Sequence, residues 1–98
     1  MRCEKRADRS KISVDGNDLA AGSYTATATS GTNSATAGPK VAVGDEAEFD
    51  FDSNANDVAA GAKLITSSFI QNNTVFGEIL NAADGLVTSG TATCRVKN

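Results

Sequence analysis

The chemistry that this sequence could carry is concentrated in an acidic segment, residues 45–57. The segment holds six acidic residues and no basic one, namely Asp45, Glu46, Glu48, Asp50, Asp52 and Asp57. Toward its end, side chains that carry oxygen alternate along the chain. These are Asp50, Asp52, Asn54, Asn56 and Asp57. Carboxylate and amide oxygens are the ligands that Ca²⁺ prefers in proteins. These five residues are therefore candidate ligands of a calcium site.

Two interpretations of the acidic segment are open. The helix-loop-helix calcium loop is excluded, because it needs glycine at its sixth position and glutamate at its twelfth. Counting from Asp50, those positions hold Ala55 and Gly61. A looser calcium site remains as one interpretation. The leading one is the solvated acidic face of a strand, paired across a sheet with the N-terminal segment. Residues 1–11 carry a net charge of +3, whereas the whole chain has a formal net charge of −3.

The two cysteines, Cys3 and Cys94, lie near opposite ends of the 98-residue chain. A metal site normally uses histidines or closely spaced cysteine pairs, and this sequence has no histidine. We therefore predict a Cys3–Cys94 disulfide, with the first and last strands side by side. In the chain-entropy model, closing a loop of nearly the whole chain stabilises the fold by roughly 4–5 kcal/mol. Such a bridge indicates an oxidising location, either periplasmic, at the cell surface or secreted.

Several classes of function are not expected. Without histidine, and with both cysteines in a bridge, the usual nucleophile–base pairs are missing, so we expect no enzyme. Paired carboxylates among Glu46, Glu48 and Asp50 could cleave a glycosidic bond, but they would stand on an exposed strand without a cleft. The basic residues lack interleaved aromatics, so we expect no nucleic-acid binding. No long apolar run is present, so we expect no membrane insertion, and an export signal should precede Met1 in the precursor.

The pattern of residues predicts one all-β domain over residues 1–98. Ten threonines and nine serines, with repeated alternation of apolar and polar residues, favour strands over helices. The predicted strands cover residues 10–15, 23–30, 35–43, 46–52, 63–70, 74–81 and 86–97, and the run from Arg2 is a possible extension of the first. Seven or eight short strands with frequent turns are typical of a small antiparallel β-sandwich or barrel.

Some local expectations follow from this pattern. Cys3 and Ile12 fall on opposite phases, so a bulge near residues 7–9 is needed if both face the core. Residues 53–61 form a polar loop, with one helical turn that Asp57 begins. Sixteen of the apolar residues are alanine, so the core is thin. Its large members include Phe49, Phe51, Phe69, Phe76, Ile79 and Leu80.

The strand over residues 35–43 should lie at the edge of a sheet. It contains Gly38-Pro39, and proline has no N–H to donate to a neighbouring strand. An exposed edge can recruit another strand. A protein partner or self-association through this edge is therefore the expected mode of interaction.

One short pattern resembles a known class of protein. Leu19-Ala20-Ala21-Gly22-Ser23-Tyr24-Thr25-Ala26 resembles the Leu-x-x-Gly-x-Tyr-x-Val stretch of bacterial immunoglobulin-like and transthyretin-like β-sandwich modules. In that pattern the glycine lets the chain turn sharply and the tyrosine packs at the corner. The resemblance covers about eight residues and implies a structural or adhesive module, with no functional residues to carry over.

The expected function is a non-catalytic, secreted or periplasmic structural or interaction module that needs no cofactor. The alternative is a small ligand-binding or calcium-binding protein that uses residues 50–57.

Overall fold

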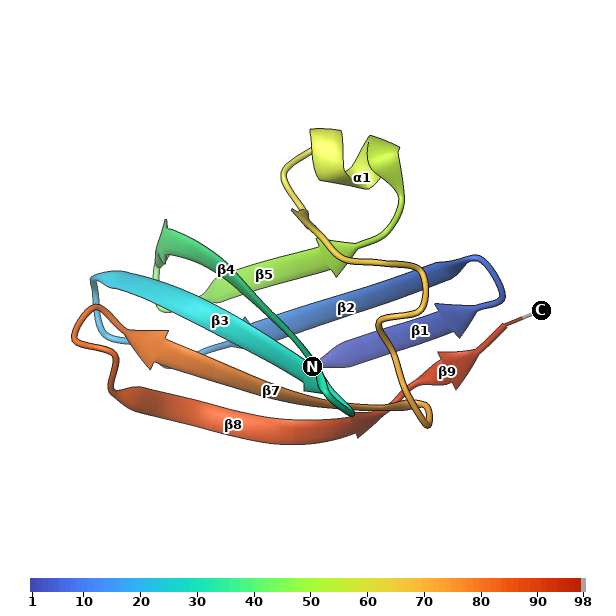
Figure 1. Cartoon of the computed structure of the whole chain (residues 1–98). Coiled ribbons are helices and arrows are strands. Elements are labelled where there is room, and N and C mark those ends of the chain that lie inside the picture. Colours follow the sequence, from blue (N-terminus) through green and yellow to red (C-terminus); the bar gives the residue numbers. More distant parts are fainter. Residues whose placement is uncertain (98) are drawn as a thin grey trace.

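The computed structural model describes residues 1–97 and places two β-sheets face to face (Figure 1). One sheet has five strands in the order β6-β5-β2-β1-β9, and the other has four in the order β4-β3-β7-β8. The elements of residues 1–97 are β1 (Arg2–Arg6), β2 (Arg9–Gly16), β3 (Ser23–Ser30), β4 (Asn33–Val41), β5 (Ala47–Asp52), α1 (Ala55–Ala59), β6 (Lys63–Leu64), β7 (Thr74–Asn81), β8 (Leu86–Thr93) and β9 (Arg95–Val96). The predicted β-sandwich with one disulfide is confirmed. Its strand pairs are antiparallel except β1–β9 and β5–β6.

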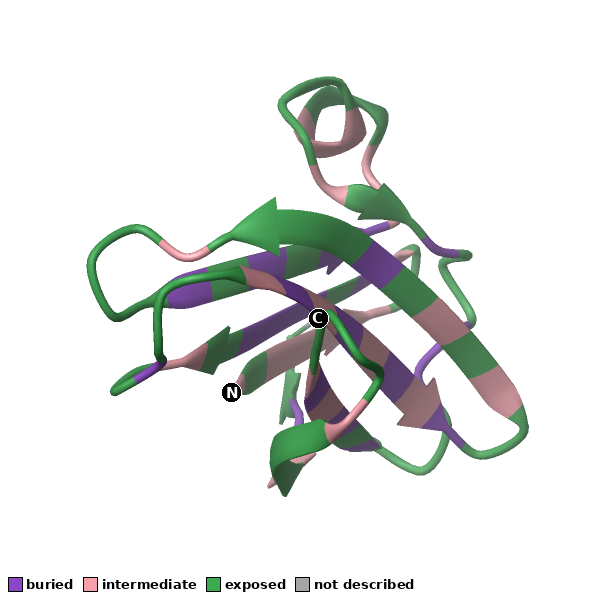
Figure 2. Cartoon of the chain, turned by 90° about the vertical axis from the view of Figure 1, so that its left-hand side faces the viewer, coloured by how far each residue is buried: buried purple, intermediate pink, exposed green. Residues whose placement is uncertain are grey.

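The core lies between the sheets and follows the period-two pattern of the strands (Figure 2). On β5, Phe49 and Phe51 are buried as predicted, with Glu48 and Asp50 on the opposite face. On β3, buried alanines alternate with half-buried threonines. Phe76 and Leu80 differ from the prediction, because both lie on the outer face of β7. Phe76 is 40% exposed and Leu80 is half-buried. The core is thus even thinner than the apolar composition indicates.

The N-terminal segment forms a hairpin. β1 and β2 pair antiparallel across a turn at Ala7 and Asp8, with Cys3 opposite Ile12. Residues that face each other in an antiparallel pair share one side of the sheet. The predicted bulge at residues 7–9 is therefore wrong, since the turn already brings Cys3 and Ile12 to the core side.

The predicted strand over residues 63–70 is mostly wrong. Only Lys63 and Leu64 form a strand, and the following loop buries its apolar side chains, Ile65, Phe69 and Ile70, in the core. Buried serines replace the missing strand pairing. Ser10 Oγ donates to the carbonyl of Ser67 (2.7 Å), and Ser30 Oγ accepts from the backbone N–H of Gln71 (2.7 Å). The buried parts of the loop are tolerated because these hydroxyls satisfy part of its backbone, while Thr66, Ser67 and Ser68 are exposed.

The predicted strand over residues 86–97 breaks at Cys94. β8 belongs to the four-stranded sheet, whereas β9 crosses to the other sheet and pairs parallel with β1. The Cys3–Cys94 disulfide closes this crossing, with the two Cα atoms 4.6 Å apart. The predicted pairing is confirmed, and the first and last strands are neighbours (Figure 1).

The turn before β3 has the geometry expected from its sequence. Gly22 adopts a φ of +149°, a conformation that side chains disfavour. Tyr24 is buried, and its hydroxyl donates to the carbonyl of Ala20 (2.7 Å). The tyrosine therefore anchors the turn to the core. Among the described residues, no helix is long and apolar enough to cross a membrane.

Candidate functional site

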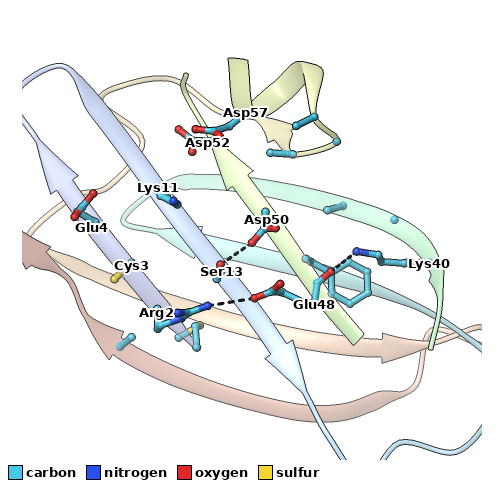
Figure 3. Close-up of a pocket in the computed structure, with 18 of the residues that line it drawn as sticks. Arg2, Cys3, Glu4, Lys11, Ser13, Lys40, Glu48, Asp50, Asp52 and Asp57 are labelled. Atoms are coloured by element: carbon cyan, nitrogen blue, oxygen red, sulfur yellow. Dashed lines mark hydrogen bonds and ion pairs between the residues drawn. The ribbon is translucent and has the colours of Figure 1, made fainter. Parts of the chain in front are cut away.

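The acidic segment lies on the outer face of the five-stranded sheet, where a hollow of about 1020 Å³ is bordered by β1, β2, β4, β5 and α1 (Figure 3). The polar side chains that line it are Arg2, Glu4, Lys11, Ser13, Lys40, Glu48, Asp50, Asp52, Asp57, Thr93 and Arg95. Lys40 reaches over from β4 and donates to the carbonyl of Glu48 (2.7 Å). This hollow is the candidate site.

β2 lies between β1 and β5, so residues of the N-terminal segment stand beside the acids of β5 on the floor of the hollow. In one row, Ser13 pairs with Asp50 and its hydroxyl donates to the carboxylate (2.6 Å). Arg2 spans from β1 to β5, with Nη2 3.2 Å from Glu48 Oε1. The predicted pairing of the acidic strand with the basic N-terminal segment is confirmed. Exposed pairs of this kind contribute about 0–1 kcal/mol each.

The strongest interaction of the site centres on Arg9. Its Nε and Nη2 donate to the two carboxylate oxygens of Asp52 (2.9 and 2.7 Å), and Nη2 also contacts Asp57. Such two-pronged arginine–carboxylate contacts are the strong kind of ion pair. Asp52 is only 2% exposed and Arg9 20%. Asp52 was predicted to be solvated like the other acids of its strand. It does lie on the outer face, but Arg9 and the start of the following loop bury it.

Burial of Asp52 is the largest single influence on its pKa and raises it, but the hydrogen bonds from Arg9 and the N–H of Asn54, together with the charge of Arg9, lower it. The pKa of Asp52 therefore lies below its ordinary value. The hydrogen bond to Asp52 likewise raises the pKa of Arg9, against the opposing effect of burial. Both groups are held in their charged forms, and each neutralises the other.

Helix α1 begins at Ala55 rather than at Asp57 as predicted. Asn54 Oδ1 accepts from the N–H groups of Asn56 (2.9 Å) and Asp57 (3.4 Å) and so caps the helix. An asparagine at this position is among the best caps. The cap aims Asp57 at Arg9 and uses one of the amide oxygens that the calcium hypothesis needs.

The five candidate ligands do not gather around one point. Asp52 and Asp57 come together on either side of Arg9, while Asp50 lies apart beside Ser13 (Figure 3). In residues 1–97, no group of three or more His, Cys, Asp or Glu side chains is placed to hold a metal ion. The sequence indicated a basic partner for the acids, but not that Arg9 would be the residue between them.

Millimolar calcium is expected to leave the thermal unfolding midpoint unchanged, since a cation at Asp52 and Asp57 would have to displace the Arg9 guanidinium. A ligand that binds only the folded state raises the midpoint, and the rise grows with the logarithm of one plus the ratio of ligand concentration to Kd. Differential scanning fluorimetry with calcium, with magnesium and with chelator tests this. A rise with calcium alone that disappears in Asp57→Asn would restore the calcium hypothesis.

A second cluster ties the C-terminal strand to the sheet. Glu4 lies between Arg6 Nε and Lys97 Nζ, each 3.2 Å from a carboxylate oxygen. The hydrogen bond with Lys97 is the main cause that lowers the pKa of Glu4. The outer face of this sheet thus satisfies much of its charge internally. No protein-family model, no curated protein and no solved structure matches this chain.

Proposed function

We propose that this chain is a non-catalytic interaction module that works in the periplasm, at the cell surface or outside the cell. The observation that carries the proposal is the contrast between the two outer faces of the sandwich. The face of the five-stranded sheet is charged, and many of its charges are paired with one another.

The outer face of the four-stranded sheet, here called the hydroxyl face, is almost uncharged. It is formed by Thr25, Thr27, Thr29, Ser34, Thr36, Phe76, Glu78, Leu80, Ser89 and Thr91, all exposed or half-buried. Glu78 is the one charged residue of this set. Neighbouring strands align these side chains in rows, such as Thr36–Thr27–Glu78–Ser89. The cores of protein–protein interfaces are depleted of charged residues, so this face suits such a contact better than the charged face does.

A catalytic role finds little support in the charged hollow. A general acid needs a carboxyl group that holds its proton near neutral pH, and the pKa of Asp52 is shifted downward. Its carboxylate is also occupied by Arg9 on both oxygens. The location rests on the disulfide, because such bridges persist in oxidising compartments.

The proposed location is tested on protein purified from its natural source with thiols blocked during lysis. We expect the intact mass to show a closed Cys3–Cys94 bridge with no blocked thiol. Two blocked thiols would contradict the extracytoplasmic location.

The proposed interaction role is tested with a photo-crosslinking amino acid at Thr36 on the hydroxyl face. The same group at Lys11, on the charged face, is the matched control. We expect specific cross-linked products in the native compartment from Thr36 and none from Lys11. The reverse pattern, or products from neither position, would contradict the role of the hydroxyl face.

A further inference from the structure

The four edge strands of the sandwich differ in how they are protected against pairing with another chain. Natural sheets protect their edges with charges, proline, bulges or short strands. β6 and β9 have two residues each, with Lys63 and Arg95 among them. β4 carries Pro39 and Lys40, and its register with β3 shifts near Tyr24. Three of the four edges are therefore protected.

β8 has little of this protection. Its register with β7 shifts once near its start, between Ile79 and Leu80, and the pairing is regular from Thr88 to Thr93. Its eight residues, Leu-Val-Thr-Ser-Gly-Thr-Ala-Thr, include no charge and no proline, and seven of them are exposed. It lies at the border of the four-stranded sheet, beyond β7 (Figure 1). Leu86 is 58% exposed and Val87 42%, and the exposed Phe76 of β7 stands opposite Thr91. A long, neutral edge of this kind is a template for strand pairing.

The backbone of β8 presents its hydrogen-bonding groups to this free edge. The N–H of Cys94 donates to the carbonyl of Asn73, the residue before β7. In an antiparallel pair, successive residues alternate between pointing toward the partner strand and away from it. Continuing the alternation along β8, Ser89 and Thr91 direct their N–H and C=O groups away from β7.

We infer that β8 pairs antiparallel with β8 of a second copy of this chain, which joins two four-stranded sheets into one. The inference goes beyond the proposed role of the hydroxyl face, because the contact lies along the β8 edge and leaves that face free. A two-fold axis perpendicular to the sheet, passing at Gly90, sets Ser89 opposite Thr91 of the other copy. It also keeps both hydroxyl faces on the same side.

A second copy fits this edge because a two-fold symmetric contact places β8 of one copy against β8 of the other. A charged strand would meet like charges there, whereas β8 has none. Serine and threonine opposite one another stabilise a strand pair through their hydroxyls.

The test compares association of the intact protein with that of a variant carrying Ser89→Lys and Thr91→Lys, by sedimentation over a range of concentrations. The substitutions lie on an exposed strand and place lysines opposite each other only in the dimer. We expect the dimer dissociation constant to rise by roughly tenfold or more, since like charges in register destabilise a strand pair. Thr36→Lys, on the opposite edge of the same face, is the matched control and should associate normally.

A second experiment tests whether the association depends on pairing between the two β8 strands. Mixing the lysine variant with one carrying Ser89→Glu and Thr91→Glu should restore a heterodimer, while each variant alone stays weakened. A protein that is monomeric at all concentrations overturns the inference, and so does a dimer sensitive to Thr36→Lys but not to the β8 changes. Cross-linking from Thr36 in a monomeric protein would leave the proposed interaction role standing without self-pairing.

Discussion

Replacing Cys3 and Cys94 together by alanine is expected to lower the free energy of unfolding by about 4–5 kcal/mol, the loop-closure contribution for a bridge that encloses nearly the whole chain. The bridged residues are 91 positions apart. Folded domains are stable by only about 5–15 kcal/mol in total. The core here is thin, since it relies on alanines such as Ala26 and Ala28. The double variant should therefore unfold at a midpoint roughly 20–30 °C lower, measured by circular dichroism.

The wild-type protein provides the control for this result. Adding reductant should bring its unfolding midpoint down to that of the double variant, and reductant should leave the variant itself unchanged. If the double variant unfolds within a few degrees of the oxidised wild type, the bridge is not what stabilises the sandwich. Denaturant unfolding provides the free energy independently of temperature.

The bridge is needed at this position because the chain changes sheets there. β8 ends at Thr93 in one sheet, and β9 begins at Arg95 in the other. β9 has only two residues paired with β1. Strand pairs of that length contribute little by themselves. Without the bridge, β9 should separate first, which hydrogen exchange at the N–H of Lys97, the donor to the carbonyl of Lys5, can detect.

Much of the fold could be predicted from the sequence because its signals are local. The alternation around Phe49 and Phe51 identifies a strand and its buried face without knowledge of its neighbours. The disulfide followed from the absence of other uses for Cys3 and Cys94. Residues 65–70 were predicted wrongly because apolar residues such as Ile65, Phe69 and Ile70 can be buried by a strand or by a loop. The choice depends on Ser10 and Ser30, which are distant in the chain.

The site was predicted only in part, because some of its signals are local and others depend on the order of the strands. The acidic segment and its basic counterpart could be recognised from composition. The order β5-β2-β1, however, decides that Arg9 rather than another base meets Asp52 and Asp57. Strand order also explains why the edge strand at Pro39 was predicted while the edge at β8 was not. Proline marks an edge locally, whereas β8 shows no such residue and is an edge only by its place in the sheet.

Arg9→Met is expected to destabilise the protein by about 3 kcal/mol, because it leaves the buried carboxylate of Asp52 without its partner. Removing one member of a buried ion pair typically costs about 3–5 kcal/mol. The lower end applies because a fifth of the Arg9 side chain is exposed. The double variant Arg9→Met with Asp52→Leu should regain most of the loss, since neither charge then remains. Urea unfolding at neutral pH measures all three proteins.

The pH dependence separates an unpaired buried charge from a mere loss of packing. In the wild type, the pKa of Asp52 lies below its ordinary value of 3.8. A lowered pKa stabilises the fold above the ordinary value, and that contribution is lost as the pH falls through the pKa of the folded state. In Arg9→Met the main lowering contact is gone, and burial favours the protonated acid. The stability gap between wild type and Arg9→Met should therefore narrow as the pH falls from 6 toward 3, a range chosen to span roughly the ordinary carboxyl pKa. A gap that stays constant with pH would mean that Arg9 acts through its aliphatic stem, whose packing does not depend on the charge of Asp52.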